Sequence, residues 1–574
     1  MTDQAAYQLL NQVVAKMTAG GEVFEIGEAR VRGHSMRVWK NAPLTMRDFW
    51  LGSRQFGPRD YLVYQQERLT YEQTHQAVER IVNALVSRGI KQHDRVAIAM
   101  RNYPEWLQAY WAIICLGAVP VGVNAWWVPE ELEYGLRDSG ARLLICDQER
   151  LQRFASVRQH FPQMQVVSVR VTADHQPDWA LDWSTLLDAP TGMPEVVIDP
   201  EDDACIFYTS GTTGHPKGAQ LSHRGCANNA MTMVFFSLAQ AVAQALVRGE
   251  APPNPSDPNA PQSATIVATP LFHVTANNCL AHGMTATGGK IVHMYKWDAG
   301  VALKLIEQEG ITGFSGVPTM AREIISHPDF ANTDTSKLQT LAGGGAAVQA
   351  DLVDRIVRDG DGTMPSQGYG MTELCGIAVA GAGIFLAGKP DSTGFVSPVL
   401  DLKIVNTEGQ EVAVGARGEV CLYGPQVITG YLNRPDATAA TIVDGWLHTG
   451  DVGFVDNEGF LYLVDRIKEM VLRGGENVYC LEVETALYKS DGVAECSVFG
   501  VPDERLGEEV GAAIFAREGV KLDAQRLREA CAQHLAAYKI PKYIWLVDDP
   551  LPRNANGKFV KKVLRDSLKI ADAQ

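Results

Sequence analysis

The stretch Tyr208-Thr-Ser-Gly-Thr-Thr-Gly-His-Pro-Lys-Gly-Ala219 is the most informative part of this chain. It follows the apolar run Ala204-Cys-Ile-Phe-Tyr208, which predicts a buried strand. Its glycines let backbone N–H groups come close to an anion, and its hydroxyls and Lys217 add donors. The order is not that of a Walker loop, in which Gly-Lys is followed by Ser or Thr. The stretch therefore predicts a phosphate-binding loop of another type.

Five further motifs follow this loop in the chain. They are Pro270-Leu-Phe-His-Val274, Gln367-Gly-Tyr-Gly-Met-Thr-Glu373, His448-Thr-Gly-Asp451, Asp465-Arg-Ile-Lys-Glu-Met-Val-Leu-Arg-Gly-Gly475 and Pro552-Arg-Asn-Ala-Asn-Gly-Lys558. In content and order, the six motifs resemble the signatures of the adenylate-forming superfamily, which includes acyl-CoA synthetases, peptide-synthetase adenylation domains and beetle luciferases. Within this superfamily the chain looks most like a fatty-acyl-CoA synthetase, an AMP-forming carboxylic acid:CoA ligase.

The arrangement of apolar runs predicts an α/β fold. Strand-like runs alternate with helical patterns, which is typical of parallel sheets covered by helices. These runs are 95–99, 142–146, 165–169, 204–208, 265–268 and 313–317. We expect a large N-terminal domain over residues 1–465, with a β-rich subdomain at about 390–464. A smaller, mobile α+β domain is expected over residues 466–574, and the proline-rich segment 249–264 is expected to be an exposed spacer.

Composition narrows the class of protein. A formal net charge of −16 argues against a nucleic-acid partner. Ten scattered cysteines without a C-x-x-C pair indicate reduced thiols, and the N-terminus lacks the pattern of a signal peptide, so we expect a cytoplasmic protein. The uncharged stretch Trp106–Val128 reaches membrane-spanning length, but Gly117 and Pro120 favour a buried helix, a turn and a short strand.

The resemblance implies an ATP site. The β- and γ-phosphates would be held by Thr209, Ser210, Gly211, Thr212, Thr213, Gly214 and Lys217. The ring of Tyr369 would stack on adenine, beside Gly370 and the small-residue segment Gly343, Gly344 and Gly345. Thr372 would reach the α-phosphate, and Glu373 would bind Mg²⁺, which prefers oxygen ligands. Asp451 would accept the ribose hydroxyls, and Arg466 would add a ribose or phosphate contact.

The C-terminal motifs imply a two-step reaction. Lys558 matches the lysine that bridges the carboxylate and the α-phosphate during adenylation. Lys468 matches the hinge about which the C-terminal domain rotates before the second step. Arg473, Gly474 and Gly475 would then line the tunnel for the pantetheine arm of coenzyme A.

The acyl site is the least specified by the motifs. His273 matches a residue at its mouth, and two roles stay open: gating or orienting the carboxylate, or simply packing in the core. Asn277, Val317 and Gly376 are candidates for the acyl pocket. The segment 273–278 contains no aspartate to bind an α-amino group, which disfavours an amino-acid substrate.

We therefore expect an enzyme that converts a fatty acid, ATP and coenzyme A to acyl-CoA in the presence of Mg²⁺. The alternatives are an aryl or alicyclic acid as substrate, a carrier-protein thiol as acceptor and, more remotely, a catalytically silent nucleotide-binding protein or luciferase-like oxidation. No transmembrane span is expected. Peripheral membrane contact, a homodimer and the chain length of the acid stay open.

Overall fold

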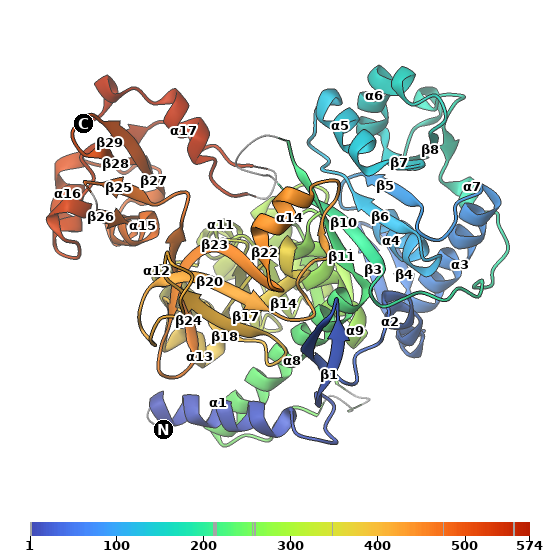
Figure 1. Cartoon of the computed structure of the whole chain (residues 1–574), viewed down its shortest axis with the longest axis horizontal. Coiled ribbons are helices and arrows are strands. Elements are labelled where there is room, and N and C mark those ends of the chain that lie inside the picture. Colours follow the sequence, from blue (N-terminus) through green and yellow to red (C-terminus); the bar gives the residue numbers. More distant parts are fainter. Residues whose placement is uncertain are drawn as a thin grey trace.

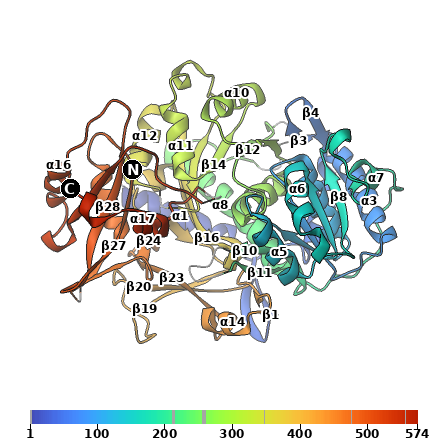
Figure 2. The same cartoon turned by 90° about the horizontal axis from the view of Figure 1, so that it is seen from above.

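The computed structural model describes residues 3–209, 215–254, 257, 260–346, 348–474, 476–554 and 557–574. Figures 1 and 2 show three parts side by side: a blue and cyan lobe, a green to orange middle part, and a red C-terminal lobe. The predicted α/β class is confirmed.

The first lobe is built on an eight-stranded sheet. Its strand order is β21 (Gly430–Tyr431), β11 (Lys217–Ser222), β10 (Asp203–Thr209), β6 (Val119–Gly122), β5 (Arg95–Ala99), β7 (Leu143–Asp147), β8 (Gln165–Val169) and β9 (Leu181–Asp182). From β10 to β9 neighbouring strands are parallel. Their continuous apolar sequences suit burial on both faces.

Helices cover both faces of this sheet. They are α3 (Tyr71–Ser87), α4 (Pro104–Cys115), α5 (Pro129–Ser139), α6 (Gln148–Val157) and α7 (Ser184–Leu187). The uncharged stretch Trp106–Val128 forms α4, a turn at Gly117 with φ of +70°, and β6, as the sequence predicts. All three segments are buried.

A fourteen-stranded sheet forms the middle part. In order, its strands are β19 (Asp401–Val405), β20 (Gly418–Tyr423), β23 (Trp446–Val455), β24 (Phe460–Arg466), β18 (Gly394–Val396), β17 (Gly376–Ala382), β16 (Met364–Met371), β15 (Thr340–Gly344), β14 (Gly313–Gly316), β12 (Ala264–Val267), β13 (Lys290–His293), β3 (Asp60–Tyr64) and β4 (Glu67–Thr70), with β22 (Ile442–Val443) beside β23. Strands from β16 to β3 are parallel. The β-rich segment expected at 390–464 mostly continues this sheet through antiparallel strands, whereas β21 joins the other sheet.

Helix α8 (His223–Arg248) begins directly after the β10–β11 hairpin. The Ser222 side chain caps its first turn by accepting from Gly225 N, and Gly249 ends it in the left-handed conformation. Within the described residues α8 alone is long and apolar enough to cross a membrane, but it packs against α1 (Asp3–Met17), β17 and α9 (His282–Thr287).

Shorter helices complete the middle part, and a β-hairpin lies at the N-terminus. The helices are α2 (Met46–Gly52), α10 (Ala299–Glu309), α11 (Pro318–Ser326), α12 (Ala350–Asp359), α13 (Gly383–Ala387) and α14 (Pro435–Thr441). The hairpin strands are β1 (Ile26–Val31) and β2 (His34–Trp39).

The C-terminal lobe has its own five-stranded sheet and hydrophobic core. Its strands are β26 (Glu476–Val478), β25 (Val471–Arg473), β28 (Gly507–Ala516), β27 (Val493–Asp503) and β29 (Tyr543–Val547). Its helices are α15 (Cys480–Tyr488), α16 (Ala524–Ala532) and α17 (Lys561–Ser567). A short turn between the end of β24 and the start of β25 joins this lobe to the middle part.

Candidate active site

The predicted motifs meet at one cavity of about 1390 Å³. It lies where β15 and β16 end and β17 begins, and residues of the C-terminal lobe complete its wall. The predicted residues in the wall are Thr209, Lys217, His273, Gly343, Gly344, Gly345, Tyr369, Gly370, Thr372, Glu373, Gly376, Arg466, Lys468 and Lys558. Ser210, Gly211, Thr212, Thr213, Gly214 and Gly475 lie outside the described residues.

Behind this wall, Asp451 holds two of the predicted residues together. The Tyr369 hydroxyl donates to Asp451 Oδ2 at 2.7 Å, and Arg466 Nε donates to Asp451 Oδ1 at 3.0 Å. Burial, with the Asp451 charge nearby, raises the pKa of Tyr369 well above its usual value, so this hydroxyl stays a donor. Each carboxylate oxygen keeps acceptor capacity for a further donor, such as a ribose hydroxyl.

Glu373 is paired with a residue that the sequence motifs do not contain. Tyr431 on β21 donates from its hydroxyl to Glu373 Oε1 at 2.7 Å. The ammonium of Lys217 lies over the Tyr431 ring, 4.7 Å from its centroid. Strand pairing explains this cluster, because Tyr431 is opposite Ala219 on the strand that begins at Lys217. An anionic oxygen ligand beside the cavity fits a hard cation such as Mg²⁺.

Lys558 reaches the cavity from the C-terminal lobe. Asn554 N donates to Lys558 O at 2.9 Å, and Lys558 N donates to Asn554 Oδ1 at 3.1 Å, so two hydrogen bonds join these residues. A Cβ placed on Gly345 would lie 3.7 Å from Lys558 Cε, which brings the lysine beside the small-residue segment. Burial, helped by the charge of Arg466, lowers the pKa of Lys558.

His273 is neutral in this setting. Burial, together with the positive charge of Lys558, lowers its pKa to about 3. Its Nδ1 accepts from Thr275 N at 3.3 Å and lies 3.0 Å from Thr275 Oγ1. The ring proton is therefore on Nε2, which leaves a neutral donor at the cavity wall.

The hinge candidate Lys468 lies in the turn between β24 and β25 and lines the cavity. Just before it, Asp465 accepts from Arg466 N at 2.7 Å and from the backbone N–H of Cys480. Just after it, Glu469 lies 3.4 Å from the ammonium of Lys561. Polar contacts thus anchor both sides of the turn.

Of the residues predicted for coenzyme A, Arg473 and Gly474 do not line the cavity in this conformation. Arg473 forms a double hydrogen bond with Glu509, at 2.6 and 3.0 Å, within the C-terminal lobe. Gly474 follows with φ of +59° at the β25–β26 turn, a backbone conformation that favours glycine. Neither is among the described residues that line the cavity.

Two acyl-pocket predictions do not match the cavity wall as the structure describes it. Asn277 is fully buried and donates to Asn278 Oδ1 at 2.8 Å, within a polar cluster of the core. Val317 packs against Gly557 of the C-terminal turn. Gly376 does line the cavity, and a Cβ at this position would come within 2.5 Å of Asn229 Oδ1.

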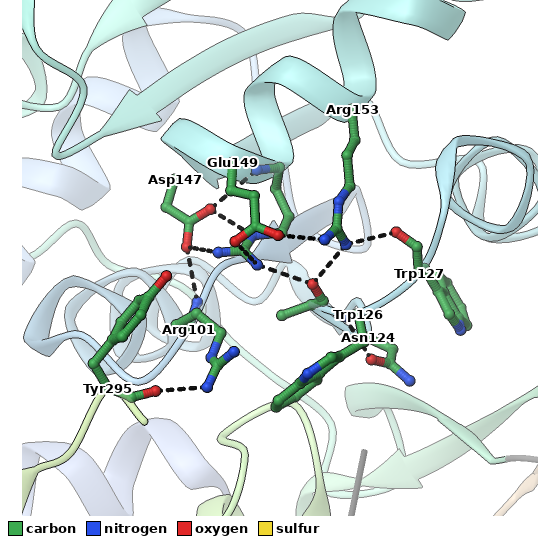
Figure 3. Close-up of polar contacts among 10 residues, drawn as sticks. Arg101, Asn124, Trp126, Trp127, Asp147, Glu149, Arg153 and Tyr295 are labelled. Carbon is green, nitrogen blue, oxygen red and sulfur yellow. Dashed lines mark hydrogen bonds and ion pairs between the residues drawn. The ribbon is translucent and has the colours of Figure 1, made fainter. Parts of the chain in front are cut away.

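The tryptophan pair at 126 and 127 supports the site from the first lobe (Figure 3). Arg150 and Arg153 each donate to the carbonyl of Ala125 at 3.0 Å. This loop turns Trp127 towards Tyr208, at the end of the strand before the phosphate loop, with ring centroids 5.4 Å apart.

The neighbouring Trp126 stays 40% exposed and contacts a different segment of the chain. Its ring lies edge-on against Phe272, the residue before His273, with centroids 5.5 Å apart. The guanidinium of Arg101 covers it at 4.3 Å. The two tryptophans therefore brace the phosphate-loop strand and the histidine segment, a role with no signal in the local sequence.

Comparison with known proteins agrees with this geometry. Residues 50–432 match the AMP-binding enzyme family, and residues 482–558 match the AMP-binding enzyme C-terminal domain. A feruloyl-CoA synthase of Amycolatopsis sp is 36% identical over 499 residues, which cover 87% of this chain and 93% of that protein. A 3-[(3aS,4S,7aS)-7a-methyl-1,5-dioxo-octahydro-1H-inden-4-yl]propanoyl:CoA ligase of Rhodococcus jostii is 33% identical, covering 90% of this chain and 97% of the relative.

The fold is also that of solved relatives. A crystal structure of the anthranilate CoA ligase AuaEII with anthranoyl-AMP superposes with a TM-score of 0.82 at 26% identity, covering 92% of this chain and 98% of that one. Other matching relatives are named for long-chain fatty acids, indoleacetate and 4-coumarate. The chain belongs to the AMP-binding enzyme family, the adenylate-forming enzymes, and within it to the AMP-forming acid–thiol ligases, which use ATP, Mg²⁺ and coenzyme A.

Proposed function

We propose that this protein activates a long apolar carboxylic acid, with a fatty acid as the preferred class, and transfers the acyl group to coenzyme A. The observation that carries the proposal is that the cavity does not end at the nucleotide motifs. It continues along α8 to Arg248 and is lined there mainly by small and apolar residues. Such a continuation accommodates an acyl body longer than a single aromatic ring.

In the first step, a carboxylate oxygen of the acid attacks the α-phosphorus of ATP. The new O–P bond forms as the bond to pyrophosphate breaks, and the products are acyl-AMP and pyrophosphate. Lys558, buried next to Gly345, stabilises the negative charge between the carboxylate and the α-phosphate, and the Thr372 hydroxyl donates to the same region. Glu373 would hold the Mg²⁺ ion, whose charge would offset that of the phosphates.

Binding groups for the nucleotide surround this centre. Lys217 supplies a cation for the outer phosphates together with the phosphate loop. Asp451, held by Tyr369 and Arg466, accepts the ribose hydroxyls. The neutral His273 donates from Nε2 and orients the carboxylate without repelling the nearby Lys558 ammonium.

In the second step, the thiol sulfur of coenzyme A attacks the acyl carbonyl. The C–S bond forms, the thiol proton is lost, and the bond to AMP breaks. Lys558 occupies the cavity in the present conformation, while Arg473 and Gly474 do not line it. The second step needs space for the thiol and a binding surface for the pantetheine arm. A rotation about Lys468 would provide both, because it would withdraw Lys558 and bring the segment 473–475 to the cavity.

Two alternatives differ in substrate or acceptor. Relatives named for feruloyl, indoleacetate and bicyclic propanoyl substrates support an aryl or alicyclic acid. A relative named as a fatty acid–[acyl-carrier-protein] ligase supports a carrier-protein thiol as acceptor. We place the reaction in the cytoplasm, which agrees with ten cysteines that are all free thiols.

The test is ATP-dependent release of AMP and pyrophosphate over fatty, aryl, alicyclic and amino acids, with and without coenzyme A. Products are identified by mass. CoA-dependent AMP release with a long-chain acyl-CoA product is the expected result. Acyl-AMP that accumulates despite coenzyme A would indicate a carrier protein as acceptor, and turnover of aryl acids alone would contradict the long-chain proposal.

A further inference from the structure

The N-terminal hairpin of β1 and β2 turns over two residues, Arg32 and Gly33 (Figure 1). Val31 pairs with His34 across the turn, and the two turn residues have φ of +48° and +86°. Turns of this kind favour Asn-Gly, because asparagine tolerates the left-handed conformation better than most residues with a side chain. The hairpin also precedes residues 50–432, which match the family. An arginine held in this conformation, outside the family motifs, therefore points to a role for its side chain.

The guanidinium of Arg32 binds the segment between β20 and β21. Its Nη1 donates to the carbonyl of Val427 at 2.6 Å and to that of Ile428 at 2.7 Å. Both of these residues are buried, and neither belongs to a regular strand. Buried carbonyls outside a sheet ladder need donors from elsewhere. Arg32 supplies them here and so fixes the position of residues 427 and 428.

The same segment holds Glu373 at two points. Ile428 N donates to Glu373 O at 3.0 Å, which fixes the main chain of the glutamate. Three residues later, the Tyr431 hydroxyl donates to Glu373 Oε1 at 2.7 Å, which fixes its carboxylate. Glu373 lines the cavity. A shift of the segment would therefore move the expected Mg²⁺ ligand.

A second arginine of the hairpin provides a comparison. Arg37 on β2 donates to Leu400 O at 2.9 Å and to the Asp401 carboxylate at 2.6 Å. These two partners lie at the start of β19, on the outer edge of the large sheet. Neither is among the described residues that line the cavity. Arg37 thus docks the hairpin on the protein by contacts that do not include the segment bound to Glu373.

We infer that Arg32 is a positioning residue for Glu373. It acts through residues 427–431, without touching ATP or the metal ion, and its effect falls on the part of ATP binding that depends on Mg²⁺. The inference rests on the proposed function, which assigns the Mg²⁺ ion to Glu373. It makes the N-terminal hairpin a functional part of the nucleotide site.

The experiment measures the Kd of ATP by isothermal titration, once in excess Mg²⁺ and once in EDTA, and takes the ratio of the two values. Arg32→Met removes the donors and keeps an unbranched side chain. Arg32→Lys keeps a single nitrogen that can donate to both carbonyls, as Nη1 does. Arg37→Met is the matched control from the same hairpin, and Glu373→Gln tests the metal ligand itself. The KM values for MgATP and for the acid provide a second readout.

We expect the wild type to bind ATP more tightly with Mg²⁺ than without it. Arg32→Met should reduce this preference about tenfold and raise the KM for MgATP while the KM for the acid stays unchanged. Arg32→Lys should recover most of the preference, and Arg37→Met should keep the wild-type ratio. A general defect of folding or of the nucleotide pocket would weaken ATP binding equally with and without Mg²⁺, so it would not move the ratio.

The variants separate the ways in which the inference could fail. If Glu373→Gln loses the preference for Mg²⁺ and Arg32→Met keeps it, the inference is overturned and the proposed role of Glu373 stands. An equal loss in Arg37→Met would assign the effect to docking of the hairpin and would also overturn the inference. A wild-type ratio in Glu373→Gln would refute the proposed metal role of Glu373, and the inference with it.

Discussion

The hydroxyl of Tyr431 donates a 2.7 Å hydrogen bond to the carboxylate of Glu373, while the Tyr431 ring faces the ammonium of Lys217 at 4.7 Å. One side chain thus orients both the expected Mg²⁺ ligand and the lysine next to the phosphate loop. Burial and the charge of Glu373 raise the pKa of Tyr431 above its usual value, so the hydroxyl remains a donor at neutral pH.

Tyr431→Phe should weaken the use of MgATP more than the use of the acid. Without the donor, Glu373 loses a hydrogen bond of about 1 to 2 kcal/mol, so we expect a rise of about tenfold in KM for MgATP. Steady-state kinetics at varied MgATP and varied acid measure this. Tyr423→Phe is the control, because that hydroxyl bonds Ser35 O away from the cavity. Equal changes in both KM values would contradict the assigned role.

Lys558→Ala should separate the two half-reactions. Loss of a cation that acts on the developing charge costs roughly 10² to 10³ in the rate of acyl-AMP formation. Thioester formation from supplied acyl-AMP should stay close to the wild-type rate. Single-turnover measurements of each step test this, with the exposed Lys562→Ala as the control. If both half-reactions slow equally, the proposal that Lys558 acts only in acyl-AMP formation is wrong.

Acidification should destabilise the protein through its buried histidines. Burial lowers the pKa to about 3 in each of His75, His223, His273, His282 and His293. The unfolded chain binds protons below about pH 6.5 while the folded chain does not, so the free energy of unfolding falls as the pH drops from about 6.5 towards 3.

Urea unfolding at several pH values measures this slope. Both ring nitrogens of His293 lack a hydrogen-bond partner among the described residues, so His293→Phe should flatten the slope. His93→Gln, on the surface with 62% of its side chain exposed, should leave the slope unchanged. A His293→Phe variant with the wild-type slope would exclude this histidine as a source of acid sensitivity.

Arg150→Met should destabilise the first lobe. Arg150 donates to both oxygens of the buried Asp147, at 2.6 and 2.7 Å, so its loss leaves a buried carboxylate without its partner. We expect a decrease of about 3 to 5 kcal/mol in the free energy of unfolding. Arg153→Met, which removes a more exposed arginine bound to the same loop, should cost less.

A second variant checks the cause of that loss. Asp147→Asn combined with Arg150→Met removes the unpaired charge and should recover part of the stability, as chemical denaturation would show. A double variant as unstable as Arg150→Met alone would assign the effect to the carbonyl contacts of the loop.

Much of the fold was predictable because its signals are local. The apolar runs at 95–99, 142–146 and 204–208 lie in strands of the parallel part of one sheet, and Gly117 forms the turn that splits the uncharged stretch. The β-rich segment was also recognisable from its glycine-punctuated strands. Its incorporation into the large sheet was not, because strand pairing between distant segments leaves no local pattern.

Some residues of the candidate site were predictable from the sequence, and others were not. Glu373 and Lys558 lie in sequence motifs that identify them through the adjacent residues, and both line the cavity. Tyr431 belongs to a two-residue strand whose meaning depends on its pairing with β11. Asn277 follows the histidine motif and so was a reasonable candidate for the acyl pocket. In the structure its side chain instead donates to Asn278, within a polar cluster of the core.

The sequence by itself determined the order of the motifs, the strands and turns that carry them, and so the family and its chemistry, because these depend on residues close together in the chain. Tertiary structure alone decided which side chains meet, such as Lys558 beside Gly345 and Tyr431 on Glu373. Those relationships follow from the packing of helices and sheets across hundreds of residues, where burial and hydrogen-bond partners are set by neighbours in space.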